Sequence, residues 1–573
     1  FRSLGVAAGY YLKYFVLEDE TVDEESRRSG LSRQKPKNLK IAQVIDDNTL
    51  LIEHGLNQEI DYPAKIEVWR NVDQRLEEIN EKLVVYDERR LPALGWEPAP
   101  DEAVLTQIMV WLNQWIRQSN IPTGWKRSPL LDTLPADLKS DPAIAPLISA
   151  EAMGAKLFKP QDGRTLQESV WLHDISRWAH GDGFDDLSRA TALFDWTIRN
   201  IQLEPDEKAT PHRPWHTLLY GRGSAEQRAW VFAGLCRQQG LNVVVLDFPD
   251  DAGSEKSAAE KHASSHAPQH WLVALISKKQ LYLFDMRLGL PLPGPQRNGV
   301  ATLEQIANDD SLLRQLDVEG TPYPLTSELA KQAQAYIVAD PFQLTLRAAQ
   351  LEAGLPGEDH LGLTVNADDV ADQLKSVSGI GSVSLWEVPF RTMRDQLSLG
   401  RSARHQEALA FEPFALRPAL WNARTRHFQG RRKAATTPGG EALDDHQEAV
   451  KLYMSKSVRP RETEIAKSPP DKQRVDAEAK LDATYWLGLL SFDDGKYGVA
   501  ANWFARPELN ASLSPWYTGA RYNLARSYEA EHKNDDAAQL LKNTPSPQQQ
   551  GNRIRAEQLT SPTEKTADVP PNN

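Results

Sequence analysis

The stretch that decides the fold is Gly223-Ser224-Ala225-Glu226-Gln227-Arg228-Ala229-Trp230-Val231-Phe232-Ala233-Gly234-Leu235-Cys236-Arg237-Gln238-Gln239-Gly240-Leu241. Its start fits a capping box, in which the Ser224 hydroxyl accepts a hydrogen bond from the Gln227 amide and the Gln227 side chain reaches back to the cap. Apolar residues then recur at helical spacing, at Ala229, Phe232, Leu235 and Cys236. Gly240 stands where a helix ends in a left-handed residue. The stretch therefore predicts one buried helix.

A second helix precedes this stretch and three strands follow it. Asp185 or Asp186 can cap a helix whose apolar residues recur every three or four positions up to Ile201. The strand candidates are residues 243–247, 271–276 and 281–285, and the polar segment 249–268 between the first two is interpreted as an inserted loop. Helices beside neighbouring antiparallel strands predict an α+β fold.

The last two strands are close enough in sequence to form a hairpin. Pairing of Ile276 with Lys279 would place His270 directly opposite Asp285, with both side chains on one face. A slip of one residue would separate them, so the facing of these two residues is a hypothesis.

Residues 185–290 resemble the transglutaminase-like core, a papain-type fold in which a catalytic Cys opens a helix, a His opens a strand and an Asp ends the next strand. The resemblance rests on the helix quoted above, on His270-Trp271 and on Leu283-Phe284-Asp285. In that family the nucleophile stands four residues before a small helix residue and fifteen before the Gly that ends the helix. Both counts give Ala225, so the resemblance implies a degenerate nucleophile position beside His270 and Asp285.

Two other residues are alternative nucleophiles. Cys236 lies about three turns along the helix, near its negative end, where the dipole disfavours a thiolate, so we expect a buried structural cysteine. Ser224 is next to the expected position, and a Ser-His-Asp triad is defined by geometry rather than by order in the chain. Its capping role already accounts for this serine, which favours the structural interpretation.

Metal and cofactor sites receive little support. His262, His266 and His270 recur every fourth residue, as zinc ligands on one helix would, but Pro268 interrupts that helix. His212 and His216 are interpreted as part of an ordered loop. The sequence has no phosphate-binding glycine-rich loop and no His-Glu-x-x-His motif, and we expect no cofactor and no metal.

The composition of the chain indicates which partners and which internal bonds to expect. The 573 residues include 66 Lys and Arg against 79 Asp and Glu, a net charge of −13, which disfavours nucleic-acid binding. One Cys excludes an intramolecular disulfide. Aromatic residues are numerous enough for several packed cores.

The first part of the chain divides into three predicted segments. Residues 1–16 are apolar with a Tyr-rich end. This pattern has two interpretations, a remnant of a membrane anchor or an ordinary helix or strand. An anchor would place the bulk of the protein outside the cytoplasm; without it a cytoplasmic protein is expected. Residues 17–38 are a predicted linker. Residues 39–160 are a predicted small mixed domain, with strands at 41–45 and 50–53 and helices at 68–85 and 104–117.

A transglutaminase-like domain is predicted over residues 165–325. The part of the chain that follows it is expected to be helical. Residues 326–440 form a helical region, and its section 391–433 is basic with aromatic residues interleaved. This section either docks an acidic partner or uses arginine stems to cover the aromatic rings, and the second interpretation is favoured.

The C-terminal part carries an internal repeat. Leu487-Gly488 is followed by Ala500 and Phe504, and Leu524-Ala525 by Ala537 and Leu541, a pattern that resembles tetratricopeptide repeats within 441–545. Residues 546–573 are interpreted as a disordered tail.

These patterns together predict a non-catalytic transglutaminase-like scaffold that binds protein partners through its core and its repeats. The alternative is an active transglutaminase or cysteine-type peptidase or hydrolase that uses Cys236 or Ser224 with His270 and Asp285. The alanine at position 225 favours the scaffold.

Overall fold

The computed structural model describes residues 11–15, 37–44, 50–52, 65–69, 102–119, 121–206, 210–248, 271–355, 357, 360–430 and 444–560. The chain divides into two compact units. One comprises Phe1–Leu83 with Gly354–Asp359, and the other comprises Val84–Ala353 with His360–Asn573.

The first unit contains a four-stranded antiparallel sheet of order β3-β2-β1-β4. The strands are β1 (Tyr11–Phe15), β2 (Lys37–Val44), β3 (Leu50–Ile52) and β4 (Lys65–Trp69). The predicted strands at 41–45 and 50–53 are confirmed. β1 lies inside the segment 1–16, for which an ordinary strand was one of the open interpretations. Two other expectations need correction: β2 begins inside the predicted linker 17–38, and β4 covers the start of the helix expected over 68–85. Residues 70–85 lie outside the described part.

The second unit is built on a six-stranded sheet of order β10-β9-β8-β7-β11-β12. Its strands are antiparallel except for the parallel pair β11–β12. The strands are β7 (Asn242–Asp247), β8 (Trp271–Ser277), β9 (Gln280–Asp285), β10 (Leu290–Pro291), β11 (Ala333–Ile337) and β12 (Ile380–Leu385). A separate parallel pair joins β5 (Gln202–Leu203) to β6 (Arg222–Gly223). Helices and a mixed sheet confirm the α+β class.

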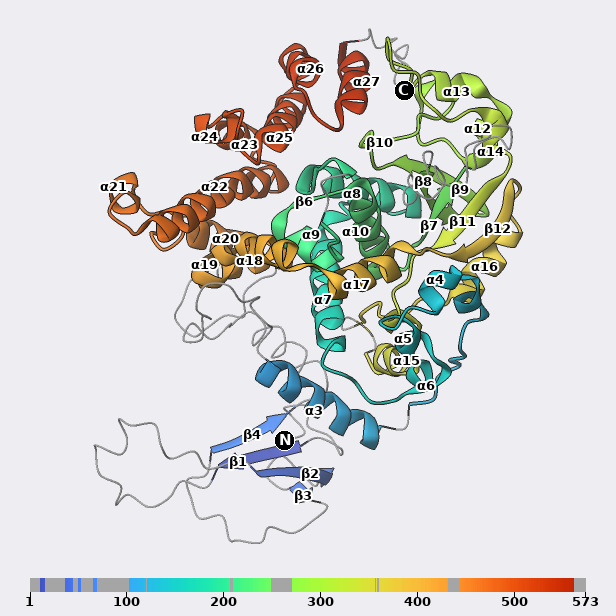
Figure 1. The fold of residues 1–573 in the computed structure, drawn as a ribbon, viewed down its shortest axis with the longest axis vertical. Coiled ribbons are helices and arrows are strands. Elements are labelled where there is room, and N and C mark those ends of the chain that lie inside the picture. The colour runs from blue at the N-terminus through green and yellow to red at the C-terminus, as the bar shows by residue number, and fades with distance from the viewer. Residues whose placement is uncertain are drawn as a thin grey trace, which may run out of the picture. The chain divides into compact units, whose positions relative to one another are not determined.

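Helices cover both faces of this sheet, because side chains along each strand alternate between two buried clusters (Figure 1). In β7, Val243 and Val245 join one cluster while Val244 and Leu246 join the other. The first cluster includes residues of α7 (Asp162–Ala179), α8 (Asp186–Asn200), α9 (Pro214–Tyr220) and α10 (Ala225–Gln238).

Short helices supply much of the second cluster. They are η1 (Pro129–Thr133), α4 (Ala136–Lys139), α5 (Ala145–Ile148), α6 (Ala150–Gly154), α12 (Leu303–Asn308), α13 (Asp310–Arg314), α14 (Ser327–Ala330), η4 (Phe342–Leu344), α16 (Ala367–Lys375) and α17 (Val388–Ser398). The unit also contains α3 (Glu102–Gln118), η3 (Pro295–Arg297) and α15 (Leu346–Ala353). The helix predicted over 104–117 is confirmed as α3.

Two predicted domain boundaries are therefore wrong. Residues 39–160 do not form one small domain, because η1 and α4–α6 bury Leu131, Leu138, Ile148 and Met153 in the same cluster as the central sheet. The region 326–440 is not simply helical, since β11 and β12 complete that sheet. Its later part does consist of helices, α17, α18 (Arg401–Leu416) and α19 (Pro418–Gln429).

In the basic section 391–433, one arginine lies against the buried aromatic side chains. The side chains of Phe411, Phe414, Trp421 and Phe428 are buried. Arg424 is also buried, and its guanidinium lies 4.7 Å from the centroid of the Phe428 ring. Arg424 thus agrees with the interpretation that arginines cover aromatic rings, whereas Arg401 and Arg404 are exposed.

The hairpin between β8 and β9 has a different register from the expected one. Ser277 pairs with Gln280, two residues away from the predicted pairing of Ile276 with Lys279. The turn contains only Lys278 and Lys279, both with positive φ (50° and 62°), which is the two-residue turn that matches strand twist. Position 285 is consequently opposite position 272, and His270 itself lies outside the described residues.

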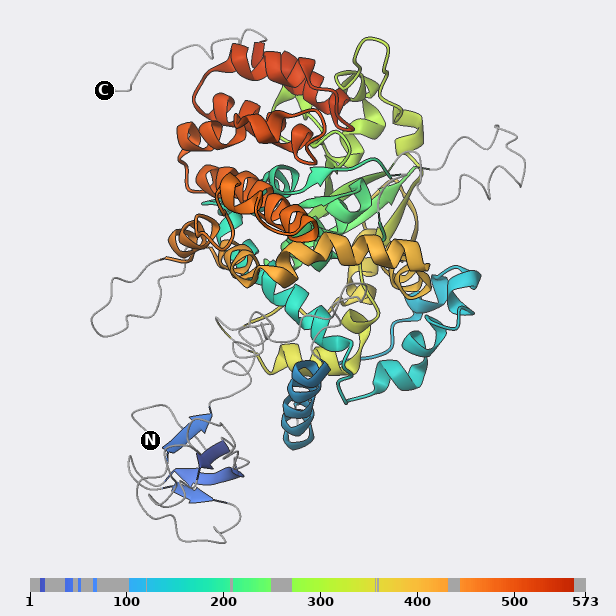
Figure 2. The same ribbon diagram turned by 60° about the vertical axis from the view of Figure 1, so that its left-hand side comes forward.

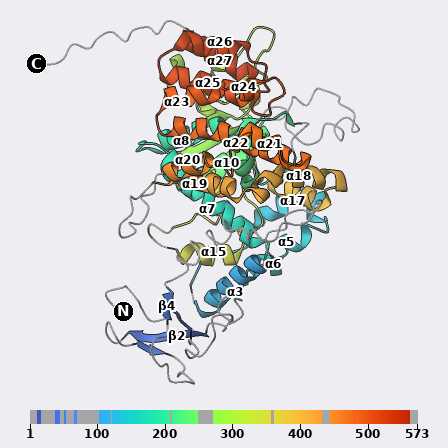
Figure 3. The same ribbon diagram turned by 90° about the vertical axis from the view of Figure 1, so that its left-hand side faces the viewer.

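The C-terminal helices stack one on the next, as Figures 2 and 3 show in orange to red. They are α20 (Asp445–Tyr453), α21 (Glu462–Ile465), α22 (Pro470–Asp493), α23 (Tyr497–Phe504), α24 (Pro507–Asn510), α25 (Tyr517–Ala530), α26 (Asn534–Asn543) and α27 (Gln549–Thr560). At Gly488 of α22, an added Cβ would lie 2.6 Å from the Phe504 ring of α23, so the two helices meet closely at the expected small residue.

The expectation of a disordered tail from residue 546 is wrong for helix α27. Ile554 and Ala556 of this helix are buried, and Gly551 lies against the backbone of Leu288. Residues 561–573 lie outside the described part.

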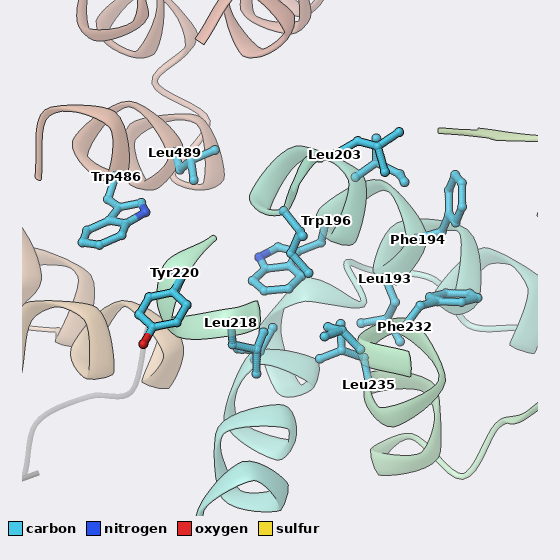
Figure 4. Close-up of a cluster of buried hydrophobic side chains, with 14 of the residues drawn as sticks. Leu193, Phe194, Trp196, Leu203, Leu218, Tyr220, Phe232, Leu235, Trp486 and Leu489 are labelled. Atoms are coloured by element: carbon cyan, nitrogen blue, oxygen red, sulfur yellow. The ribbon is translucent and has the colours of Figure 1, made fainter. Parts of the chain in front are cut away.

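These helices join the first cluster of the core rather than standing apart from it (Figure 4). In that view Trp486 and Leu489 of α22 lie on one side and Trp196 of α8 on the other, with Tyr220 and Leu218 of α9 between them. The C-terminal helices and the sheet therefore share one continuous apolar core.

Candidate functional site

The start of α10 is fixed by the capping box that its sequence predicts. Ser224 Oγ accepts the Gln227 N–H at 3.2 Å, and Gln227 Oε1 accepts the Ser224 N–H at 3.1 Å. A Cβ at position 223 would lie 2.6 Å from Gln227 Oε1, so a side chain there would displace the amide that completes the capping box. The Ser224 side chain is buried and points at its own helix, so the hydroxyl serves as a cap.

The position that the resemblance gives to a nucleophile is a buried methyl group. Ala225 is the first residue of α10, and its exposed fraction is 0%. It belongs to the cluster that also contains Ala229 and Phe232. A methyl group can neither attack a carbonyl nor exchange a proton, so this position offers no chemistry.

The lone thiol lies at the other end of the same helix. Cys236 is fully buried among apolar side chains two residues before α10 ends. Burial raises the pKa of the Cys236 thiol well above its ordinary value, and Arg189 and Arg237 oppose this only in part. A buried thiol with a raised pKa is a poor nucleophile, which agrees with a structural cysteine.

Asp285 ends β9 and holds the turn that follows. Its Oδ1 accepts the backbone N–H groups of Arg287 and Leu288, each at 2.8 Å, and its Oδ2 accepts the Tyr323 hydroxyl at 2.8 Å. Burial raises the pKa of Asp285, while these hydrogen bonds act in the opposite direction. The carboxyl group thus has a structural role of its own, and whether His270 approaches it lies outside the described residues.

One carboxyl group at the start of α10 was not singled out by the sequence. Burial and the nearby Asp206 raise the pKa of Glu226 to about 7, against the effect of Arg287. Its Oε1 is buried and has no hydrogen-bond partner among the described residues. A glutamate at the second position of a helix is ordinary, so only the tertiary structure reveals this environment.

Arg287 acts on this carboxyl group, and Trp271 packs against Arg287. The Arg287 guanidinium is 5.3 Å from the Trp271 ring centroid, and its Nη2 donates to Asp206 Oδ2 at 3.0 Å. Charged groups therefore gather around the Glu226 carboxyl group, and an aromatic ring packs against one of them.

The histidines do not form a metal site in the described part of the chain, where no cluster of three ligating side chains occurs. His262, His266 and His270 lie outside it. His216 belongs to the first turn of α9 rather than to a loop, because Pro214 starts that helix. Its ring stacks on that of His212, with centroids 5.0 Å apart, and burial lowers the pKa of both histidines.

Among the described residues, no helix combines the length and apolar character that crossing a bilayer requires. Comparison with known proteins gives no assignment: no protein-family model, no curated protein and no solved structure matches this chain.

Proposed function

We propose that this protein is a non-catalytic scaffold whose core is transglutaminase-like and whose C-terminal helices are tetratricopeptide-like. The observation that carries the proposal is Ala225, a buried methyl group at the position from which a thiol would act. Loss of the nucleophile alone removes nearly all activity of a catalytic triad, by roughly a millionfold.

The geometry of the other two candidates supports the same conclusion. The Ser224 hydroxyl is engaged by the Gln227 amide, and the Cys236 thiol is buried at the far end of the helix. An enzyme that used either residue would have to open the helix start or the apolar core.

The C-terminal helices use one face for the core of the same chain. Asn523 of α25 donates to the Arg199 carbonyl at 3.0 Å, and the Gly519 N–H donates to Gln202 Oε1 at 2.7 Å. Protein partners are therefore expected on the remaining surface of these helices. Val499 and Leu513 are exposed there, at 47% and 95%.

The site assignment is tested by restoring a thiol at the start of α10. In a Cys236→Ala background, Ala225→Cys places the only cysteine at the helix N-terminus, where the dipole favours a thiolate. The control Ala229→Cys places it one turn further along, at a position that is also buried.

We expect an activated disulfide to label Ala225→Cys at least about tenfold faster than Ala229→Cys at neutral pH, in variants shown to be folded by circular dichroism. Equal rates in the two folded variants would show that residue 225 does not lie at a nucleophile position, and the transglutaminase-like assignment would fall.

A further inference from the structure

The chain contains one Asn-Gly pair, Asn298-Gly299, which lies in a loop after β10. The Gly294 N–H donates to the Gly299 carbonyl oxygen at 3.1 Å and so closes a loop over residues 294–299. The sites described above do not include this loop. Both residues of the pair therefore lie in a closed loop whose chemistry is still unassigned.

The loop is open to solvent at this pair. Residues 295–299 are all exposed. Gly299 has a positive φ of 67°, and a Cβ added to it would meet no atom of the described residues within 4 Å. Water therefore reaches both residues, and the space beside the Gly299 Cα is free.

The hydrogen bonds of the loop do not engage the groups that could react with each other. The Asn298 N–H donates to the Pro295 carbonyl at 3.1 Å, and the Gly299 carbonyl accepts from Gly294. In the described part of the chain, the Gly299 N–H donates no hydrogen bond, and the Asn298 side-chain amide forms none. Neither group is therefore held away from the other.

The covalent structure brings these two groups together. A bond between the Gly299 nitrogen and the Asn298 Cγ would close a five-membered ring, so rotation about the bonds of Asn298 alone lets the atoms meet. Such an intramolecular reaction has a large advantage over attack by a separate molecule. Glycine has no Cβ that would hinder the approach of its nitrogen.

Asn510 has the opposite environment and serves as an internal reference. Its Nδ2 donates to the Phe504 carbonyl at 2.7 Å and to the Arg506 carbonyl at 2.9 Å. The residue that follows is Ala511, whose Cβ hinders the approach of the backbone nitrogen. Asn510 is therefore expected to be inert.

We propose that Asn298 is a site of spontaneous deamidation. The Gly299 N–H gives its proton to hydroxide, and the nitrogen attacks the Asn298 Cγ, so that a C–N bond forms. The bond from Cγ to Nδ2 then breaks, and the nitrogen takes a proton from water and leaves as ammonia. Water adds to one of the two carbonyls of the resulting succinimide ring, which opens to aspartate or isoaspartate. Water and hydroxide are the only co-reactants.

The two products change the loop in different ways. Aspartate adds one negative charge to an exposed side chain, whereas isoaspartate adds one carbon atom to the backbone. The loop has no room for a longer path, since a Cβ added at Gly294 would already lie 2.3 Å from the Asn298 carbonyl oxygen. Isoaspartate should therefore break the hydrogen bond between Gly294 and Gly299.

Mass spectrometry of the full chain during incubation at pH 8 tests the proposal, with peptic digestion at acid pH to stop further ring closure. We expect a gain of about 1 Da at Asn298 and recognition of the product by an isoaspartate-specific methyltransferase. Conversion should be at least about tenfold faster than at Asn510 and within about tenfold of the rate in urea-unfolded chain. Conversion in the unfolded chain alone would overturn the proposal, as would equal rates at the two asparagines.

Two matched glycine variants test the role of the second residue. Gly299→Ala should slow conversion at least about tenfold in a chain shown to be folded by circular dichroism. Gly320 also has a positive φ, 77°, and free space around it, so Gly320→Ala introduces similar backbone strain elsewhere and should leave the rate unchanged. An unaltered rate in Gly299→Ala, or equal slowing in both variants, would contradict attack by the Gly299 nitrogen.

Hydrogen exchange of the Gly294 amide reports the effect on the loop. The isoaspartate form should exchange faster than the natural chain, because its closing hydrogen bond is lost. Asn298→Asp carries the added charge without the added carbon and should exchange as the natural chain does. Unchanged exchange in the isoaspartate form would contradict the proposed opening of the loop.

Discussion

Two residues at the start of α10 illustrate what local sequence determines. Ser224 and Gln227 cap the helix as predicted, because a capping box depends only on residues three apart. The partners of Asp285 and Glu226 could not be predicted in this way. Tyr323 reaches Asp285 from 38 residues further along the chain, and the environment of Glu226 comes from Asp206 and Arg287.

The raised pKa of Glu226 leads to a prediction about stability. Its pKa is about 7 in the folded chain against an ordinary value of 4.5, so the folded state holds the proton more tightly. The contribution of Glu226 to stability therefore falls as the pH rises from about 4.5 to about 7. The Glu226→Gln variant has no carboxyl group to ionise at this position. It should therefore be more stable than the natural chain by about 1–3 kcal/mol at pH 8, and as stable as the natural chain near pH 4.5.

Urea unfolding of both proteins at the two pH values measures this difference. Glu304 is a suitable control, since it occupies the same position after the capping box of α12 and is exposed. Glu304→Gln should change stability by less than about 0.5 kcal/mol at either pH. A Glu226→Gln variant with no gain at pH 8 would contradict the burial of a charged carboxyl group there.

At the scale of helices and strands, the sequence predicted the elements whose residues have strong local patterns. α3, α8, α10 and strands β7, β8 and β9 lie where periodicity and caps placed them. β11 and β12 were missed because they pair with neighbours, β7 and β11, that come from distant parts of the chain. The predicted register of the β8–β9 hairpin was wrong. The predicted and the observed pairing place the same side chains on each face, so the apolar pattern cannot distinguish them. The geometry of the two-residue turn determines which pairing forms.

Helix α27 shows how a polar sequence can still be ordered. Its composition predicted disorder, but close backbone packing holds it in place. A Cβ added at Gly551 would lie 1.8 Å from the Leu288 carbonyl oxygen. Gly551→Ala should therefore destabilise the docking of α27 by about 2 kcal/mol or more. Hydrogen exchange of the α27 amides should accelerate.

The control for this substitution is Gly124→Ala, where nothing lies within 4 Å of the added Cβ. It should leave exchange in α27 unchanged. Unaltered exchange in Gly551→Ala would mean that α27 does not pack on the β9–β10 turn as described.

At the scale of the whole molecule, ion pairs as well as apolar side chains join helix α8 of the second unit to the C-terminal helices. Arg199 of α8 donates to Asp493 of α22 at 2.7 Å, and Arg526 of α25 donates to Asp195 at 2.7 Å. The pair of Arg199 and Asp493 is buried, and removing one member of a buried ion pair typically costs about 3–5 kcal/mol. The Asp195 side chain is 37% exposed, so its pair with Arg526 contributes less. Such long-range pairs leave no signal in the sequence.

The absence of a working nucleophile is the central claim, and the reactivity of the natural thiol tests it most directly. An activated disulfide is added to the folded full chain at neutral pH, and the labelled fraction is followed by mass spectrometry. Because Cys236 is buried and its pKa is raised, we predict little labelling over hours and complete labelling within minutes in denaturant. Rapid stoichiometric labelling of the folded chain would contradict the account.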